Sequence, residues 1–217
     1  MKYKCLILDH DDTIVNSTES VNYVSFTNVL SKILPDIKIT LDDFFKLNFD
    51  PGFLSMCYDV FNFNEKEMDY QVNYWKNFIS KHNPDIFDGI KEFLWDFVKQ
   101  GGSIFVISHS MGKDILRHYK YHNLPTPTAV YGFEYEESKR KPNIWPVEDI
   151  IKNHNFNRSE MLMVDDLKPG KIMADNAGIS FAAAGWAHQV PEIVNYMKQE
   201  VNYYCEKVED LRKLILG

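Results

Sequence analysis

The second half of the chain alternates short apolar runs with helical patterns, and this alternation limits the possible folds most strongly. The apolar runs span residues 103–107, 129–133, 161–164 and 179–184, with a last short one around Tyr203. The helical patterns span residues 89–100, 111–121, 146–155, 171–177, 191–198 and 208–216. Strands that alternate with helices favour a parallel sheet covered on both faces. The sequence therefore predicts an α/β protein with a Rossmann-like, three-layer parallel sheet.

A first apolar run, residues 3–8, precedes this alternation and is followed by helix signals only. These signals are Asn16 or Ser17 as the cap of a helix that reaches Pro35, the capping-box pairs Thr40–Asp43 and Asn64–Glu67, and Asp50-Pro51 as a cap with a first-turn proline. Residues 16–84 are therefore expected to form an all-helical domain. It would be inserted into a core domain made of residues 1–15 and 85–217.

Acidic residues follow two of the expected strands at the point where each strand ends. Asp9 and Asp11 follow the first run, and Asp165 and Asp166 follow the run over residues 161–164. The carboxyl ends of parallel strands lie at the edge of the sheet where open α/β folds bind ligands. Asp9 and Asp11 can face one metal-and-phosphate site from a curled loop. The alternative for the first pair is a solvated acidic turn.

Groups suited to an anion follow another strand of the predicted sheet. Ser108, His109 and Ser110 come directly after residues 103–107, and they bring hydroxyl groups and helix-start amides to the same edge. The alternative for either serine is a cap on the next helix, and His109 either contacts a substrate or faces solvent. Lys141 offers a cation for a phosphate, although a lone lysine is ordinarily a surface residue.

The composition and the net charge limit the kinds of partner that this chain is expected to bind. The 217 residues carry a formal charge of −7 and a pI near 5.5, with no basic run longer than residues 139–141. This argues against binding to nucleic acid or to an anionic membrane surface. No apolar stretch approaches the ~20 residues of a membrane span, and no signal peptide is expected. Cys5, Cys57 and Cys205 lack metal or redox spacing, so we expect a reduced, cytoplasmic protein.

In chain order, these segments resemble the four signatures of the haloacid-dehalogenase-like hydrolase superfamily. The first signature is Asp9-His-Asp11-Asp-Thr13, the second Ser108, the third Lys141-Pro142, and the fourth Val164-Asp-Asp166 with Asn176-Ala-Gly178. The resemblance covers nearly the whole chain. It implies that the helical insertion is the cap of the phosphoglycolate-phosphatase-like and β-phosphoglucomutase-like branch. Receiver domains share some of these residue types, but they begin with an acidic pair and are far shorter.

The resemblance further implies a Mg²⁺-dependent phosphatase that acts on a small phosphorylated metabolite, as a monomer or homodimer. It implies that Asp9, Asp11 and Lys141 are catalytic residues. Ser108, His109 and Lys141 would bind the phosphate. Asp9, the main-chain oxygen of Asp11, and Asp166 would bind the metal. Asp9 would form an aspartyl-phosphate, and Asp11 would act as general acid and base.

Two positions depart from the family pattern. Asp12 stands where the first motif commonly has glycine, and Gly170 stands where the fourth often has a second aspartate. The Asp165-Asp166 pair is the alternative known in the family, so metal binding is still expected. The spacing to Gly178 favours Asp166 as the ligand, with Asp165 either supporting it or lying at the surface.

Other functions of the same superfamily stay open at this point. A sugar-phosphate mutase would use the same two aspartates, and a catalytically idle phosphate- or partner-binding protein would be consistent with the two departures. Asp11 argues against carbon–halogen cleavage, which has no alcohol to protonate. A phosphonatase needs a buried cap lysine, and nothing marks one. Trp186 and His188 could border the site, but a structural role is favoured for both.

Overall fold

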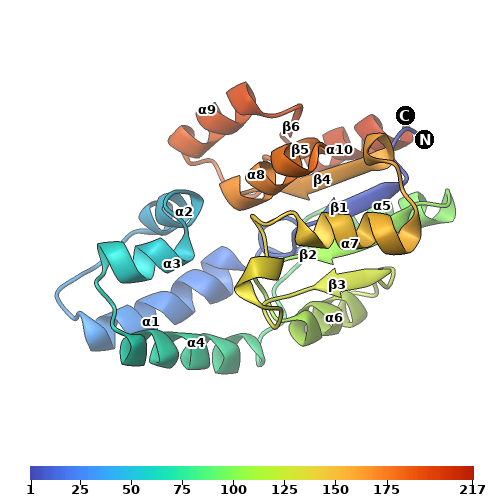
Figure 1. The fold of residues 1–217 in the computed structure, drawn as a ribbon. Helices are drawn as coiled ribbons and strands as arrows, with labels where there is room; N and C mark the ends of the chain where they lie inside the picture. The colour runs from blue at the N-terminus through green and yellow to red at the C-terminus, as the bar shows by residue number, and fades with distance from the viewer.

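Six parallel strands form one sheet in the order β3-β2-β1-β4-β5-β6 (Figure 1). The structure is a computed structural model that describes residues 1–217. The strands are β1 (Cys5–Leu8), β2 (Ser103–Ile107), β3 (Ala129–Tyr131), β4 (Met161–Asp165), β5 (Ser180–Ala184) and β6 (Tyr203–Cys205). The strand order reverses between β1 and β4, and such a switch point is where these sheets bind ligands. The predicted fold class is confirmed.

Helices cover both faces of the sheet. One face carries α5 (Ile90–Lys99), α6 (Gly112–Tyr121) and α10 (Val208–Leu216), and the other carries α7 (Trp145–His154), α8 (Lys168–Ala177) and α9 (Pro191–Glu200). The short turns η3 (Glu137–Lys139) and η4 (Arg158–Glu160) precede α7 and β4. Successive strand side chains point to opposite faces. Leu6 therefore joins the first hydrophobic layer and Ile7 the second.

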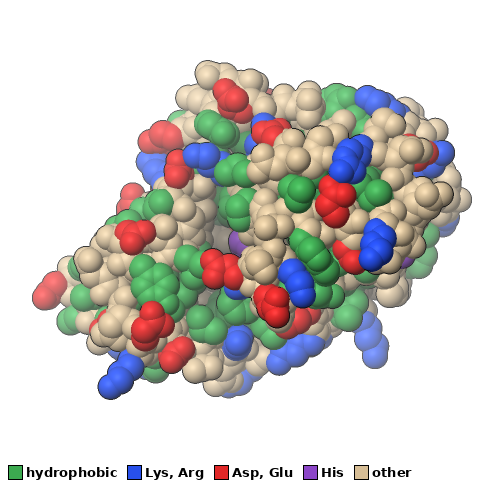
Figure 2. Space-filling model, in the orientation of Figure 1, with side chains coloured by type: hydrophobic (Ala, Val, Ile, Leu, Met, Phe, Trp, Pro, Cys, Tyr) green, Lys and Arg blue, Asp and Glu red, His purple; other side chains and the backbone are tan.

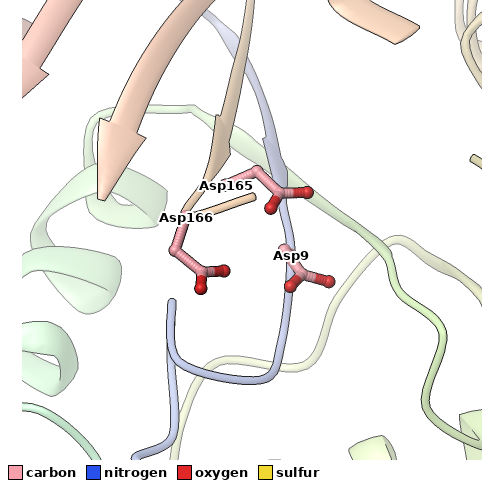
Figure 3. Close-up of side chains that lie close together, drawn as sticks. All are labelled: Asp9, Asp165 and Asp166. Atoms are coloured by element: carbon pink, nitrogen blue, oxygen red, sulfur yellow. The ribbon is translucent and has the colours of Figure 1, made fainter. Parts of the chain in front are cut away.

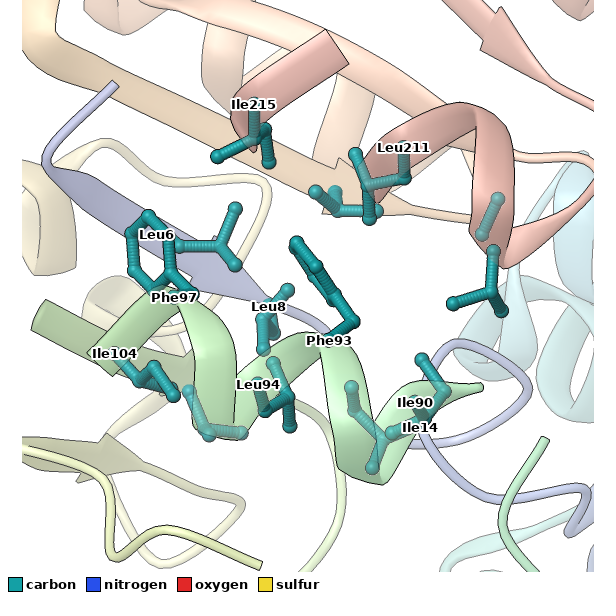
Figure 4. Packing of buried hydrophobic residues seen from close by; sticks show 14 of the residues in the cluster. Leu6, Leu8, Ile14, Ile90, Phe93, Leu94, Phe97, Ile104, Leu211 and Ile215 are labelled. Atoms are coloured by element: carbon teal, nitrogen blue, oxygen red, sulfur yellow. The ribbon is translucent and has the colours of Figure 1, made fainter. Parts of the chain in front are cut away.

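The central strand is packed tightly on the face that carries α5. Phe93 and Phe97 of α5 lie between β1 and α10, where Leu211 completes the layer (Figure 4). Every residue of β1 is at most 1% exposed. Burying one such apolar side chain stabilises a fold by about 1.5–3 kcal/mol. This packing fixes the position of the first motif, which begins where β1 ends.

The chain between β1 and α5 contains only helical elements. They are η1 (Thr18–Asn22), α1 (Tyr23–Ile33), α2 (Leu41–Phe49), α3 (Phe53–Ser55), η2 (Met56–Val60) and α4 (Glu65–Ile79). Both predicted capping boxes, at Thr40 and Asn64, are confirmed. Eight buried residues around Phe26 form a separate hydrophobic cluster. We propose that residues 16–84 form a cap domain, which enters and leaves the core at adjacent points: the amide of Asn16 donates to the carbonyl of Asp85 (2.8 Å).

The expected helix start at Asp50-Pro51 is wrong by two residues. Gly52 has a φ of 98°, which lies outside the helical region, so helix α3 begins only at Phe53. Asp50 does not cap this helix, because its carboxylate binds Lys168 at the start of α8, 2.6 Å away.

The cap also packs on the core through α2. Phe45 and Phe49 belong to the hydrophobic layer that contains α9, and Lys46 pairs with Glu192 of α9 (2.8 Å). Helix α8 starts at Lys168, three residues before the predicted start, with a proline in its first turn. No helix has both the length and the apolar character of a membrane span.

Candidate active site

Asp9 follows β1 directly and lies buried at the centre of the site. Its amide donates to the carbonyl of Val164 in β4 (2.9 Å), so the backbone continues the sheet. The residue is 4% exposed, and its Oδ1 lies 2.7 Å from Nζ of Lys141. Burial raises the pKa of Asp9 to about 7, and the charges of Asp165 and Asp11 add to this effect while Lys141 opposes it.

Lys141 enters the site from the loop between β3 and α7. Its ammonium group lies 2.7 Å from Asp9 and 2.6 Å from Asp165. Burial lowers the pKa of Lys141, but the two carboxylates outweigh burial and raise it above the ordinary value, so this lysine stays charged. The structure thus places a fixed cation beside Asp9. Its contact with a phosphate stays a prediction.

The two carboxylates at the end of β4 have different surroundings. Asp165 is fully buried, with Oδ2 on Lys141 and Oδ1 accepting from the amide of Leu167 (2.8 Å). Asp166 is 4% exposed, and neither of its carboxylate oxygens has a hydrogen-bond partner. The alternative of a surface position for Asp165 is wrong, because this residue forms the ion pair beneath the site.

Asp9, Asp165 and Asp166 bring three carboxylate oxygens within 4.8 Å of one another where β1 and β4 end (Figure 3). Burial raises the pKa of Asp166 well above its ordinary value, and the charges of Asp165, Asp12 and Asp9 raise it further. A buried carboxylate without a donor is costly unless a cation binds it, and oxygen-only ligands suit Mg²⁺. Because Asp165 already uses both oxygens, Asp9 and Asp166 fit the ion best. The Asp11 side chain lies outside this group, which leaves its main-chain oxygen for the metal.

Magnesium is expected to stabilise the folded protein, and more so at about pH 8 than at about pH 5. The folded-state pKa of Asp166 is raised, so its contribution to stability is present below the unfolded value of 3.8 and is lost as the pH rises through the folded pKa. A bound cation would stabilise the ionised carboxylate of Asp166 and so offset this loss of stability. At about 100 times its dissociation constant, an ion adds about 2.7 kcal/mol, which raises Tm by several degrees in a chain of this size. Thermal melting with and without Mg²⁺ at both pH values measures this.

The matched variants for this prediction are Asp166→Asn and Asp165→Asn. The first should lose the magnesium-induced rise in Tm, whereas the second should keep most of it despite a lower starting Tm. A ranking in the opposite order would reverse the ligand assignment.

Asp11 is held by three donors, two of which belong to the start of the cap. Its Oδ1 accepts from Ser17 (2.5 Å) and from Asn22 (3.3 Å), and its Oδ2 accepts from Ser110 (2.5 Å). Burial raises the pKa of Asp11, but the three hydrogen bonds to its carboxylate oppose burial, and the net effect is a lowering. The free site therefore holds Asp11 as a carboxylate that is tied to the cap.

Ser17 and Asn22 are candidate functional residues that the sequence analysis did not identify. Ser17 occupies the N-cap position of η1, but its hydroxyl makes no capping hydrogen bond and donates to Asp11 instead. Asn22 also accepts from the indole of Trp75 in α4 (3.1 Å). In a sequence, a serine just before a helix ordinarily predicts an N-cap, and nothing marks Asn22 as a residue of the site. The contacts of both residues with Asp11 therefore could not be predicted.

Ser108 and His109 line the cavity above the end of β2. Ser108 accepts from the amide of Ser110 (3.1 Å), and the His109 ring donates to the main-chain oxygen of Lys141 (2.8 Å). The alternative that a serine caps α6 is wrong, because Met111 occupies the cap position. Contact of Ser108 and His109 with a phosphate stays a prediction.

His10 lies between the two aspartates of the first motif. Its side chain is fully buried and contacts His118 of α6. Its Nε2 lies 2.9 Å from Nδ1 of His118, whose own Nε2 lies 3.0 Å from the carbonyl of His82. The same Nε2 of His118 also lies 3.1 Å from the guanidinium group of Arg117. Burial lowers the pKa of His10 to about 3, which keeps the ring neutral. This chain fixes the first motif to the point where the cap returns to the core.

The two departures from the family pattern have structural explanations. Asp12 has a φ of 55°, in the left-handed region that favours glycine and tolerates aspartate. Its carboxylate accepts from the amide of Thr18 (3.0 Å). A Cβ at Gly170 would collide with the carboxylate of Asp165. The absence of a side chain at residue 170 therefore leaves space for the carboxylate that holds Lys141.

Replacing Gly170 by Ala is expected to destabilise the fold by about 1–3 kcal/mol, because the added methyl overpacks the space of Asp165. Urea unfolding measures the free energy. The same substitution should cost less in the Asp165→Ala background, where the space is vacant. An equal cost in both backgrounds would show that the collision with Asp165 is not the cause.

The catalytic candidates open into a cavity of about 1100 Å³ between the core and the cap. Figure 2 shows a depression where the two parts meet. Asp9, Asp11 and Lys141 line its floor, whereas Trp186 and His188 are not part of its lining. Trp186 donates to the carbonyl of Thr13 (3.1 Å), which agrees with the structural role favoured from the sequence.

The family model of the haloacid dehalogenase-like hydrolases matches residues 6–184. The chain belongs to this family, as its motifs predicted, and is a hydrolase by class. A search of the curated proteins gives no match.

Solved structures share the fold over almost the full length of the chain. A proposed haloacid dehalogenase-like hydrolase from Bacteroides fragilis is 19% identical with a TM-score of 0.81, and covers 97% of this chain and 100% of its own. A predicted phosphatase from Clostridium acetobutylicum is 18% identical with a TM-score of 0.78, covering 100% and 99%. A proposed phosphoglycolate phosphatase from Lactobacillus plantarum is 16% identical with a TM-score of 0.78, covering 99% and 100%. At these identities the likeness establishes the fold.

Proposed function

We propose that this hydrolase is a Mg²⁺-dependent phosphatase that cleaves a small phosphomonoester through an aspartyl-phosphate on Asp9. The observation that carries the proposal is the position of Asp9 at the floor of a cavity, between the charged Lys141 and the unpartnered Asp166. The structures described as phosphatases in Clostridium acetobutylicum and Lactobacillus plantarum are consistent with this activity.

The chemistry of phosphoryl transfer requires the groups that surround Asp9. A phosphoryl group in transfer carries negative charge on its equatorial oxygens, so it needs an in-line nucleophile together with fixed cations and donors. Asp9 would attack phosphorus, while Lys141 and the hydroxyl of Ser108 would hold phosphate oxygens. A magnesium ion held by Asp9, Asp166 and the main-chain oxygen of Asp11 would neutralise the repulsion between carboxylate and phosphate.

Asp11 is the proposed general acid and base. It would give a proton to the departing alcohol and later take one from the water that hydrolyses the aspartyl-phosphate. In the free site three hydrogen bonds hold its pKa low. The negative charge of a bound phosphate would raise this pKa and favour the protonated form that the first step needs.

Phosphate release from a panel of small phosphomonoesters, with and without Mg²⁺, tests this function. We expect hydrolysis of p-nitrophenyl phosphate that a chelator abolishes and added Mg²⁺ restores. Activity that is unaffected by the chelator, or no hydrolysis of any ester, would contradict the proposal.

A further inference from the structure

The cavity has more room than a phosphate alone requires. Its volume of about 1100 Å³ is at the upper end for sites that bind drug-sized molecules. The phosphate would lie on the floor beside Asp9 and Lys141. The rest of the lining therefore faces the leaving group, which is the part of the substrate that departs with the alcohol oxygen.

Arg140, in the loop between β3 and α7, is a cation of this lining without a carboxylate partner. Both lysines of the lining, Lys141 and Lys168, are held in ion pairs. Arg140 forms no ion pair, even with Glu137, which precedes it in the same loop and also lines the cavity. Its positive charge is therefore available to a bound molecule.

The guanidinium group of Arg140 is positioned without using its hydrogen bonds. Its central carbon lies 4.5 Å from the centroid of the Phe133 ring, which is a cation–π contact. Trp75 of α4 packs edge to face on the same ring, with centroids 5.6 Å apart. None of the N–H donors of Arg140 has an acceptor, and the one on Nε is buried. A buried donor without an acceptor is costly, so a bound acceptor would stabilise this arrangement.

The positive charge of Arg140 also reaches the floor of the site. Burial lowers the pKa of His109 to about 4, and the charges of Lys141 and Arg140 act in the same direction. Lys76 of α4 lies outside the lining, but its ammonium group is 5.5 Å from the Phe133 centroid and adds positive charge nearby. Positive charge in a cleft attracts anionic ligands.

The cap side of the cavity does not select a ligand by its charge. Its one charged lining residue, Asp50, pairs with Lys168 of the core at 2.6 Å. Gln71 of α4 is 1% exposed, lines the cavity, and has an Oε1 without a hydrogen-bond partner. Its amide offers a donor as well as an acceptor, so it can bind a neutral or an anionic group. Selection by charge therefore depends on Arg140.

We propose that Arg140 binds a second anionic group, a carboxylate or a further phosphate, on the leaving group of the substrate. The edge of a guanidinium group donates two parallel hydrogen bonds to either anion, which an ammonium group cannot do. This contact holds the leaving group where the cap meets the core, while the ester phosphate lies beside Asp9. The inference rests on the phosphatase function proposed above and narrows its substrate class.

The first test measures kcat/KM with Mg²⁺ for two pairs of esters that differ in one anionic group. 3-Phosphoglycerate has a carboxylate where glycerol 3-phosphate has a hydroxymethyl group, and fructose 1,6-bisphosphate has one phosphate more than fructose 6-phosphate. We expect the member with the second anion to be preferred by about 10-fold or more in at least one pair. The pair that shows the preference identifies the anion. Equal values, or a preference for the uncharged leaving group, in both pairs would overturn the inference.

The second test changes Arg140 and measures the ratio of kcat/KM within the pair that shows the preference. Arg140→Gln removes the charge, and the ratio should fall by about 10-fold or more. Arg140→Lys keeps the charge but loses the planar edge, so it should retain part of the preference. If Arg140→Gln lowered kcat/KM for both esters by the same factor, Arg140 would not select the leaving group and the inference would be wrong.

The matched control is Lys139→Gln. It removes one positive charge from the adjacent residue, which does not line the cavity, and it should leave the ratio unchanged. A fall in the ratio as large as that in Arg140→Gln would show an effect of overall charge rather than a contact with Arg140.

The two proposals fail in distinguishable ways. If p-nitrophenyl phosphate is not hydrolysed with Mg²⁺ present, the phosphatase function fails and this inference fails with it. If that ester is hydrolysed but neither pair shows a preference for the second anion, only the inference is overturned.

Discussion

Replacing Asp9 by Asn is expected to lower phosphate release by more than about 10⁴-fold. An amide cannot attack phosphorus as a carboxylate does, and it is a weaker ligand for a hard cation. The change keeps the shape of a side chain that is only 4% exposed, so the packing at the end of β1 should persist. The measurement is steady-state hydrolysis of p-nitrophenyl phosphate with Mg²⁺, with circular dichroism to confirm folding.

The control for this variant is Asp88→Asn, which makes the same chemical change at an exposed position outside the cavity. Its turnover should match that of the unmodified protein. If Asp9→Asn retained full turnover, the nucleophile would be misassigned.

Replacing Asp11 by Asn is expected to divide the reaction into a fast first half and a slow second half. The side chain can no longer donate or accept the catalytic proton, which is worth about 10²–10⁴-fold. Nitrophenolate departs without protonation, so an activated aryl phosphate should still phosphorylate Asp9. Hydrolysis of the aspartyl-phosphate should then stall, because no base activates water. Stopped-flow absorbance should show a nitrophenolate burst close to the enzyme concentration.

Steady turnover at the original rate without a burst would contradict this role for Asp11. Asp12 is the next carboxylate to examine in that event, because it lines the same cavity and burial raises its pKa to about 7. The variant Asp12→Gly tests this directly, since glycine suits the φ of 55° at that position.

The sheet was predictable from the sequence because its strands are buried on both faces. Runs such as Leu6-Ile-Leu8 and Met161-Leu-Met-Val164 have no polar side chain, which separates them clearly from the helical patterns. The strand ends then placed Asp9 and Asp166 at one edge, and the family resemblance added Lys141. The structure brings these three residues together. The last helix was also predicted correctly, over residues 208–216.

The interactions between the cap and the core could not be predicted in the same way. Ser17 has the local signal of a helix cap, but its hydroxyl binds Asp11 instead. Asp50 likewise has a local signal of a helix start, but its partner is Lys168, which is distant in the chain. Contacts of this kind follow no periodic pattern and no fixed spacing, so a single sequence does not reveal them. The size and the lining of the cavity depend on such pairings, so they emerged only from the structure.

The most direct test of the account is to locate the covalent intermediate. Asp11→Asn is mixed with p-nitrophenyl phosphate and Mg²⁺, quenched in acid, and treated with borohydride, which reduces an aspartyl-phosphate to homoserine. Peptide mass spectrometry then identifies the modified residue. The account predicts homoserine at residue 9 and at no other aspartate. Homoserine at residue 12, 165 or 166, or nitrophenolate release without any modified aspartate, would contradict it.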